Sequence, residues 1–189
     1  MSLPEPQTTL HPFGPAVEAF DRGVDAAFER LRDQPAFDRL FFTASALGDW
    51  SLVWHLIGAT QALLDPARLP DFLRLSGTLG VESLVVNQGV KRLFHRRRPQ
   101  QEATDGPVGL RVPLTSSFPS GHASAGFCAA VLLSQRQPKL APLWFGLATV
   151  IAASRIHVRL HHASDVVAGA AVGYAIGRVA TRLWPRRPR

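Results

Sequence analysis

Three short polar clusters stand at the ends of apolar stretches of this 189-residue chain, and their residue types suit chemistry on a phosphate group. They run from Lys91 to Pro99, from Pro119 to His122 and from Ser154 to Asp165. Together they supply a nucleophile, a carboxylate to orient it, a second histidine that can move a proton, and several fixed cations. Such a set can attack phosphorus without a metal ion.

The third cluster contains a histidine and a carboxylate four residues apart, His161 and Asp165, which would share one face of a helix. A carboxylate there can accept the imidazole Nδ1–H, leave Nε2 free as a nucleophile and stabilise the charge that develops. Asp165 can equally be a first-turn acid of the last helix. On this spacing alone His162, three residues from Asp165, is a rival nucleophile.

The second cluster, Pro119-Ser120-Gly121-His122, predicts the start of a helix. Serine is a good N-cap, and glycine lets the backbone come close to a ligand. Free N–H groups and the positive end of the helix dipole make such a start a ready anion site. A plain capped helix start after a proline-containing loop is the alternative interpretation.

The first cluster gathers basic residues between Lys91 and Arg98, just before Pro99. Cations are favoured at a helix C-terminus by the dipole, and proline terminates a helix. Arginine forks also bind phosphate oxygens in pairs, and lysine adds a point charge. Both interpretations fit the run, so it informs about function only together with the other two clusters.

Helix-length apolar blocks must position these clusters. Residues 16–33 have apolar side chains every three or four positions with charges between them, which predicts an amphipathic helix on a membrane surface or against a bundle. Strand patterns are nearly absent. We therefore expect an all-α bundle of about six helices, built from that helix and five further apolar blocks. The first of these blocks should be broken near Gly48-Asp49-Trp50. The five blocks are residues 37–64, 73–94, 122–134, 140–156 and 163–184.

The blocks also favour a membrane-embedded bundle over a soluble one. They have roughly 13 to 22 residues, and a full span needs about 20. The last block is rich in glycine and alanine, which allow close helix packing in membranes. If successive blocks are antiparallel, all three clusters meet at one rim. Four tryptophans near block ends fit an interfacial belt: Trp50, Trp54, Trp144 and Trp184.

Length, cysteine count and charge limit the possible domain organisation, disulfides and binding partners. We expect an N-terminal tail over 1–15, a single helical domain over 16–184 and a basic tail over 185–189. Cys128 is alone, so no intrachain disulfide can form. No leader-like pattern opens the chain, so a cleaved signal peptide is not expected. The net charge of +7 indicates anionic partners, and the absence of basic–aromatic interleaving argues against nucleic acid.

The three clusters, in this order, match Lys-x6-Arg-Pro, Pro-Ser-Gly-His and Ser-Arg-x5-His-x3-Asp. The chain thereby resembles the type 2 phosphatidic acid phosphatase superfamily. The matching spacing selects His161 over His162, because five residues separate the histidine from Arg155. The matching residues are Lys91, Arg98, Pro99, Pro119 to His122, Ser154, Arg155, His161 and Asp165.

This resemblance implies a membrane-bound helical phosphatase that needs no metal and no cofactor. By analogy, His161 attacks phosphorus and forms a phosphohistidine, and Asp165 orients it. His122 protonates the leaving oxygen and then activates the water. The non-bridging oxygens would be held by Lys91, Arg98, Ser120, Gly121 and Arg155.

The expected substrate is a lipid phosphate or diphosphate: phosphatidic acid, a prenyl diphosphate or a prenyl-phosphosugar phosphate. Alternatives are a soluble acid phosphatase or vanadium haloperoxidase, which the same superfamily contains, and a non-catalytic anion-binding membrane module. Residues 100–118 are expected to form a rim loop or lid. Solvated surface is the favoured interpretation of the basic residues outside the pattern, which are Arg92, His95, Arg96, Arg97 and Arg111.

The distribution of positive charge predicts which side of the membrane each rim of the bundle faces. The rim opposite the clusters has its own cations, so the positive-inside rule makes that rim cytoplasmic. We expect an integral protein of a bacterial plasma membrane with its active site on the extracytoplasmic face. The cations of the opposite rim are Arg68, Arg136, Lys139, Arg182, Arg186, Arg187 and Arg189.

Overall fold

The computed structural model describes residues 13–99 and 115–184, and every regular element in these two segments is helical. The all-α prediction is therefore confirmed. The predictions for Arg111, for most of the 100–118 loop and for the 185–189 tail fall outside the described residues.

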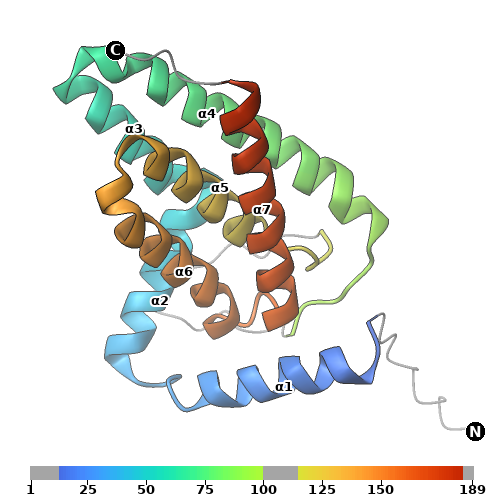
Figure 1. The fold of residues 1–189 in the computed structure, drawn as a ribbon. Coiled ribbons are helices and arrows are strands. Elements are labelled where there is room, and N and C mark those ends of the chain that lie inside the picture. Colours follow the sequence, from blue (N-terminus) through green and yellow to red (C-terminus); the bar gives the residue numbers. More distant parts are fainter. Residues whose placement is uncertain (1–12, 100–114, 185–189) are drawn as a thin grey trace, which may run out of the picture.

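Helix α1 (Pro15–Glu29) lies across one end of the bundle instead of running along it (Figure 1). Pro15 at its first position suits a helix start, where the missing N–H would have no intrahelical partner. Its apolar side, with Val24 and Phe28, packs on a cluster formed by α5, α6 and α7. The predicted amphipathic helix is thus present, and it covers the bundle end where α6 finishes and α7 begins (Figure 1).

Helices α2 (Pro35–Gly48) and α3 (Leu52–Leu64) are two halves of one apolar segment. A single 3₁₀ turn, Asp49–Ser51, separates them. Trp50 and Ser51 both have left-handed backbone angles there, with φ of 55° and 57°. The break predicted near Gly48-Asp49-Trp50 is confirmed, and it turns the Asp49 side chain away from a straight helical path.

Helix α4 (Leu69–Ser83) continues through a π-helical turn (Leu84–Gly89) and a 3₁₀ turn (Val90–Leu93). Phe94 has extended backbone angles, and no regular element is present from there to Pro99. The expectation that Pro99 ends this helix is wrong, because the helical path ends at Leu93. Arg96 and Arg98 follow on this irregular segment and are buried, whereas Arg97 is exposed.

Helices α5 (Gly121–Arg136), α6 (Ala141–His157) and α7 (Ala163–Leu183) form the centre of the molecule (Figure 1). The α5–α7 contact depends on small residues. A Cβ atom at Gly169 or Gly173 would collide with the backbone carbonyls of Ser120 or Ser124. The prediction of close helix packing in the last block is confirmed, and it brings the start of α5 against the start of α7.

Within residues 13–99 and 115–184, three helical segments are long and apolar enough to cross a membrane: 35–64, 138–157 and 163–183. Large apolar side chains such as Leu63, Leu64 and Leu84 are exposed on the outside of the bundle, where lipid would solvate them. Together these features support a membrane-embedded bundle.

The interfacial role predicted for the four tryptophans is wrong for two of them. Trp54 and Trp144 are buried in the main core, with Trp54 only 1% exposed. They pack in one buried cluster with alanines, leucines and Ile151. Trp50 and Trp184 are exposed, as an interfacial position requires.

Candidate active site

One cavity of about 690 Å³ lies where the end of α2, the end of the α4 segment and the start of α5 meet, and all three polar clusters contribute to its wall. Lys91 comes from the end of the α4 segment, Gly121 and His122 from the start of α5, and Arg155 and His161 from the end of α6 and the loop after it. The antiparallel arrangement predicted from the blocks thus brings the clusters together at one rim. The two histidines face the same space.

His161 is held in the short loop between α6 and α7, where its backbone N–H donates to Arg155 O at 3.0 Å. Its Nε2 atom lies 3.2 Å from Arg98 Nη1. Since a guanidinium can only donate, Nε2 is the acceptor and carries the lone pair of the ring. The atom that a nucleophilic histidine must keep unprotonated is therefore Nε2.

Asp165 lies behind His161, fully buried in the first turn of α7. Its Oδ2 is 3.6 Å from His161 Nδ1 and accepts a 2.9 Å hydrogen bond from the His162 backbone N–H. The expectation that histidine and carboxylate share one helix is wrong, because His161 precedes α7. Asp165 combines both sequence interpretations: it is a first-turn acid of α7 and the carboxylate nearest to Nδ1.

Burial has a further effect on His161. The side chain is 2% exposed, and loss of solvation lowers its pKa well below the usual 6.5, with the charges of Arg98 and Arg155 acting in the same direction. The ring is therefore neutral at neutral pH. Asp165 becomes more important as positive charge develops on the ring during attack.

His122, in the first turn of α5, has two acceptors at one ring nitrogen. Its Nε2 lies 3.1 Å from Asp49 Oδ1 and 3.2 Å from the backbone oxygen of Ser45. Both neighbours require a proton on Nε2. The other ring nitrogen, Nδ1, is then the atom that can donate or accept a proton.

The end of α2 supports His122, and sequence reasoning missed this. A Cβ atom at Gly48 would come within 2.5 Å of His122 Cδ2 and 2.8 Å of Ile151 Cγ2, so only glycine allows this approach. A signal for Asp49 was present: a carboxylate inside an apolar block of spanning length is costly and usually functional. The sequence did not indicate that His122 is the partner of Asp49.

Four cations of the described residues gather at the cavity. Lys91, Arg92 and Arg155 line it, and Arg98 Nη1 lies 3.2 Å from His161 Nε2. Burial lowers the pKa of Lys91 to about 8, helped by the charges of Arg98 and Arg155, and burial also lowers the pKa of Arg98. Cations that repel one another in a confined space are unfavourable unless an anion joins them. In the cavity wall Lys91, Arg92 and Arg155 outnumber the carboxyl groups of Asp49 and Glu82, so the cavity favours an anion.

Arg155 also joins α6 to α2. Its Nη1 donates to the hydroxyl of Ser45, whose backbone oxygen accepts from His122. Ser45 thus contacts both the cation and the second histidine, although nothing in its sequence context set it apart from other small residues of α2.

Ser120 and Gly121 behave differently. Ser120 is fully buried; its hydroxyl accepts from the Ala123 N–H at 3.4 Å, and its backbone N–H donates to Asp165 O at 2.9 Å. It caps α5 and joins it to α7, whereas Gly121 lines the cavity. Direct contact of Ser120 with a ligand stays a prediction.

The prediction that Arg96 lies on the solvated surface is wrong. Arg96 is buried and pairs with Asp165 and Asp21, on the irregular segment that follows the helix end at Leu93. Arg92, His95 and Arg97 are exposed, as predicted.

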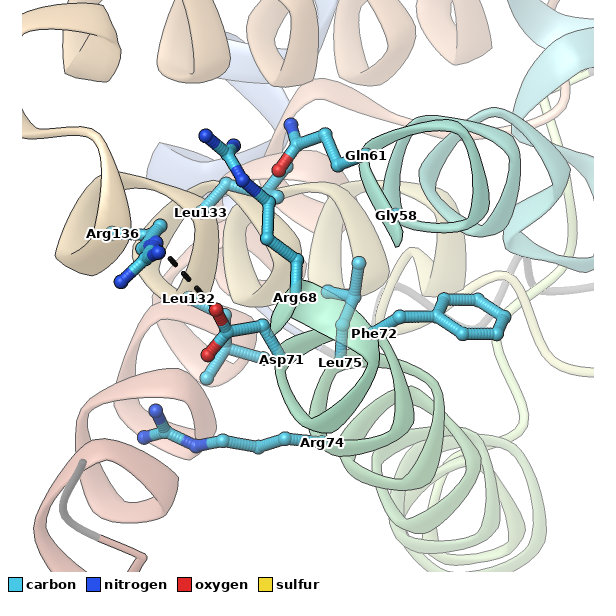
Figure 2. Close-up of a pocket in the computed structure, with 10 residues that line it drawn as sticks. All are labelled: Gly58, Gln61, Arg68, Asp71, Phe72, Arg74, Leu75, Leu132, Leu133 and Arg136. Atoms are coloured by element: carbon cyan, nitrogen blue, oxygen red, sulfur yellow. Dashed lines mark ion pairs between the residues drawn. The ribbon is translucent and has the colours of Figure 1, made fainter. Parts of the chain in front are cut away.

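A second pocket lies at the opposite end, between the end of α3, the start of α4 and the end of α5 (Figure 2). Its volume is about 20 Å³, which suits roughly one water molecule. Asp71 and Arg136 form an ion pair of 3.6 Å across it (Figure 2). It is too small for a phosphate head group.

Comparison with known proteins agrees with the geometry. Residues 72–189 match the family profile described as the PAP2 superfamily. The chain is 29% identical over 159 residues to the decaprenylphosphoryl-5-phosphoribose phosphatase of Mycobacterium tuberculosis, covering 84% of this chain and 87% of that protein. It is 35% identical over 126 residues to the protein of the same name from Mycolicibacterium smegmatis, covering 66% and 67%. A lipid A 1-phosphatase of Porphyromonas gingivalis is 33% identical over 111 residues, covering 56% and 22%.

Two solved structures share the fold. A transmembrane PAP2-type phosphatidylglycerolphosphate phosphatase from Bacillus subtilis superimposes with a TM-score of 0.72 at 22% identity, over 94% of this chain and 91% of that one. LpxE from Aquifex aeolicus superimposes with a TM-score of 0.69 at 23% identity, over 90% and 97%. The helical architecture is therefore that of known membrane proteins.

Proposed function

Because this chain belongs to the PAP2 superfamily, we propose that it is a membrane phosphatase that hydrolyses a lipid phosphate through a phosphohistidine intermediate. The observation that carries the proposal is the shared cavity, where His161 and His122 face one space lined by Lys91 and Arg155. Two histidines with separate carboxylate neighbours are what a two-step phosphoryl transfer needs.

In the first step, Nε2 of His161 attacks phosphorus. A P–N bond forms while the bond from phosphorus to the leaving oxygen breaks. Asp165 stabilises the positive imidazole ring that results. Burial lowers the pKa of His122 to about 4, whereas the negative charges of Asp49 and of the bound phosphate raise it and favour a second proton on the ring. The doubly protonated ring then gives its Nδ1 proton to the leaving oxygen, so the lipid departs as an alcohol or as a shorter phosphate.

In the second step, water attacks the phosphohistidine. Nδ1 of His122, now unprotonated, accepts a proton from the water as the new P–O bond forms and the P–N bond breaks. His161 is regenerated with its lone pair on Nε2, and phosphate leaves. Throughout, Lys91, Arg98 and Arg155 balance the negative charge on the non-bridging oxygens.

For the substrate, we favour a prenyl-phosphosugar phosphate among the lipid phosphates. The mycobacterial relatives named as decaprenylphosphoryl-5-phosphoribose phosphatases align over most of the described bundle. The apolar outer surface would keep the lipid tail in the bilayer while the head group enters the cavity. The basic residues of the opposite end favour an extracytoplasmic cavity, and the described ones are Arg68, Arg136, Lys139 and Arg182.

The test is phosphate release by the purified protein in detergent, screened over prenyl-phosphosugar phosphates, phosphatidic acid, prenyl diphosphates and water-soluble esters. We expect turnover of a lipid substrate and background release by His161→Ala that remains folded. Turnover by His161→Ala at the rate of the unmodified protein would eliminate the proposed nucleophile. A protein that binds lipid phosphate but releases none would be an anion-binding module.

A further inference from the structure

Arg96 is not part of the family signature, yet it occupies a central position behind the cavity. Its guanidinium is buried between two buried carboxylates on different helices. Nη1 donates to Asp165 Oδ1 at 2.5 Å, and Nη2 donates to Asp21 Oδ2 at 2.6 Å. Asp21 comes from α1, so one arginine connects the amphipathic helix to the carboxylate nearest the proposed nucleophile.

Asp21 is itself held at both oxygens. Oδ1 accepts from the backbone N–H of Ser164 at 2.7 Å, and Oδ2 accepts from the Ser164 hydroxyl at 2.8 Å. Arg96 Nη1 also lies 2.7 Å from that hydroxyl oxygen. Ser164 immediately precedes Asp165, so the network closes around the first turn of α7. Such a closed, buried network has few alternative arrangements.

The two oxygens of Asp165 therefore have different tasks. Oδ1 is engaged by Arg96, while Oδ2 faces the His162 N–H and lies 3.6 Å from His161 Nδ1. Tilting the carboxylate out of its plane would break the bond to Arg96, so Arg96 fixes the orientation in which the carboxylate faces His161.

We propose that Arg96 and Asp21 are positioning residues of the reaction: through Asp165 they orient His161 for attack. The inference rests on the proposed function of His161 as nucleophile. It makes α1 a part of the active site, because Asp21 holds Arg96 in place. Phe13, just before α1, adds to this, since Arg96 lies 4.9 Å above its ring.

The expected effect of Arg96→Gln or Asp21→Asn is a fall in kcat by about 10- to 100-fold, the size found for outer partners that orient metal-binding histidines. KM should stay within about twofold, because neither residue lines the cavity. Arg96→Lys keeps the charge but loses the two-pronged fork, and it should restore only part of the rate.

The readout that separates positioning from simple stability is a double-mutant cycle with Asp165→Asn. If Arg96 acts through Asp165, adding Arg96→Gln to Asp165→Asn should change kcat by less than about twofold. A merely structural role would lower kcat by a similar factor in both backgrounds.

Arg32 provides the matched control. It also joins the α1 region to the bundle: Nε donates to His157 O and Nη2 to Ile156 O, both at 2.9 Å, and it pairs with Asp25. Arg32→Gln should lower the melting temperature and leave kcat within about twofold.

Unchanged kcat in folded Arg96→Gln and Asp21→Asn would overturn the proposal, as would an equal loss in Arg32→Gln. Additive effects of Arg96→Gln and Asp165→Asn would also overturn it. If Arg96→Gln does not fold, Asp21→Asn carries the same test. Wild-type turnover with full activity of His161→Ala would instead refute the proposed function, so the two failures are distinguishable.

Discussion

Asp49 Oδ1 lies 3.1 Å from His122 Nε2, which gives the cavity a second histidine–carboxylate pair beside His161 and Asp165. The two pairs differ in setting. Asp165 is fully buried, whereas the Asp49 side chain is 37% exposed at the kink between α2 and α3. A buried pair suits a ring that gains charge only during attack, and a partly solvated pair suits a ring that exchanges protons with substrate and water.

Replacing Asp49 by asparagine should lower kcat by about 10- to 100-fold, because the neutral amide can still accept the Nε2 proton of His122 but no longer supplies the negative charge that stabilises the protonated ring. KM should change little. The matched control is Asp71→Asn, which removes a carboxylate paired with Arg136 at the opposite end of the bundle. Steady-state kinetics of both variants measure the effect; equal activity of Asp49→Asn and wild type would contradict the assigned proton path.

Gly48→Ala should impair catalysis through His122. The new Cβ would lie 2.5 Å from His122 Cδ2, so the ring or α2 must shift. We expect a loss of kcat of at least about tenfold, since small misplacements of a catalytic group are costly. Gly146→Ala is a matched control, because its Cβ would meet nothing within 4 Å. If both variants turn over substrate equally well, the close packing on His122 has no catalytic importance.

The alkaline side of the pH profile should report Lys91. Burial lowers its pKa to about 8, so the amine is charged below that pH and becomes neutral above it. The ratio kcat/KM, which reports the free enzyme, should therefore fall as pH rises through about 8. Bound phosphate favours the charged amine, so kcat itself should fall at higher pH. Lys91→Arg should move the fall in kcat/KM to higher pH, and an unchanged profile would show that another group causes it.

The acid side of the pH profile should show no titration of His161. Because its pKa is well below 6.5, the ring stays neutral and nucleophilic as pH falls from about 8 to about 6. The rate of phosphoenzyme formation should be constant over this range, measured by rapid quenching into alkali, which preserves phosphohistidine. A formation rate that falls with a midpoint near 6.5 would mean that His161 titrates as an ordinary exposed histidine.

Chelation and vanadate distinguish the proposed chemistry from metal-dependent hydrolysis. EDTA should leave phosphate release unchanged, because His161 and the surrounding cations supply the nucleophile and the charge stabilisation. Vanadate should inhibit competitively, because it can adopt the five-coordinate geometry of the transition state beside His161. Loss of turnover with EDTA and its recovery with a divalent metal would require a different mechanism.

Local patterns were sufficient for much of this protein. The helices, the break at Gly48-Asp49-Trp50 and the small-residue face of α7 follow from hydrophobic periodicity and residue size, which act over a few neighbouring residues. The antiparallel order of the blocks then places Lys91 and His161 at the same rim. These features depend on spacing along the chain, and spacing is visible in a sequence.

Tertiary structure alone decided which residues support the two histidines. Asp49, Ser45 and Asp21 reach the site only because α2 and α1 pack against the ends of α5, α6 and α7, and Arg96 reaches it because the helix ends at Leu93. Such contacts join segments far apart in the chain, and their energy depends on the angles and distances between packed helices. Local sequence contains no measure of those quantities.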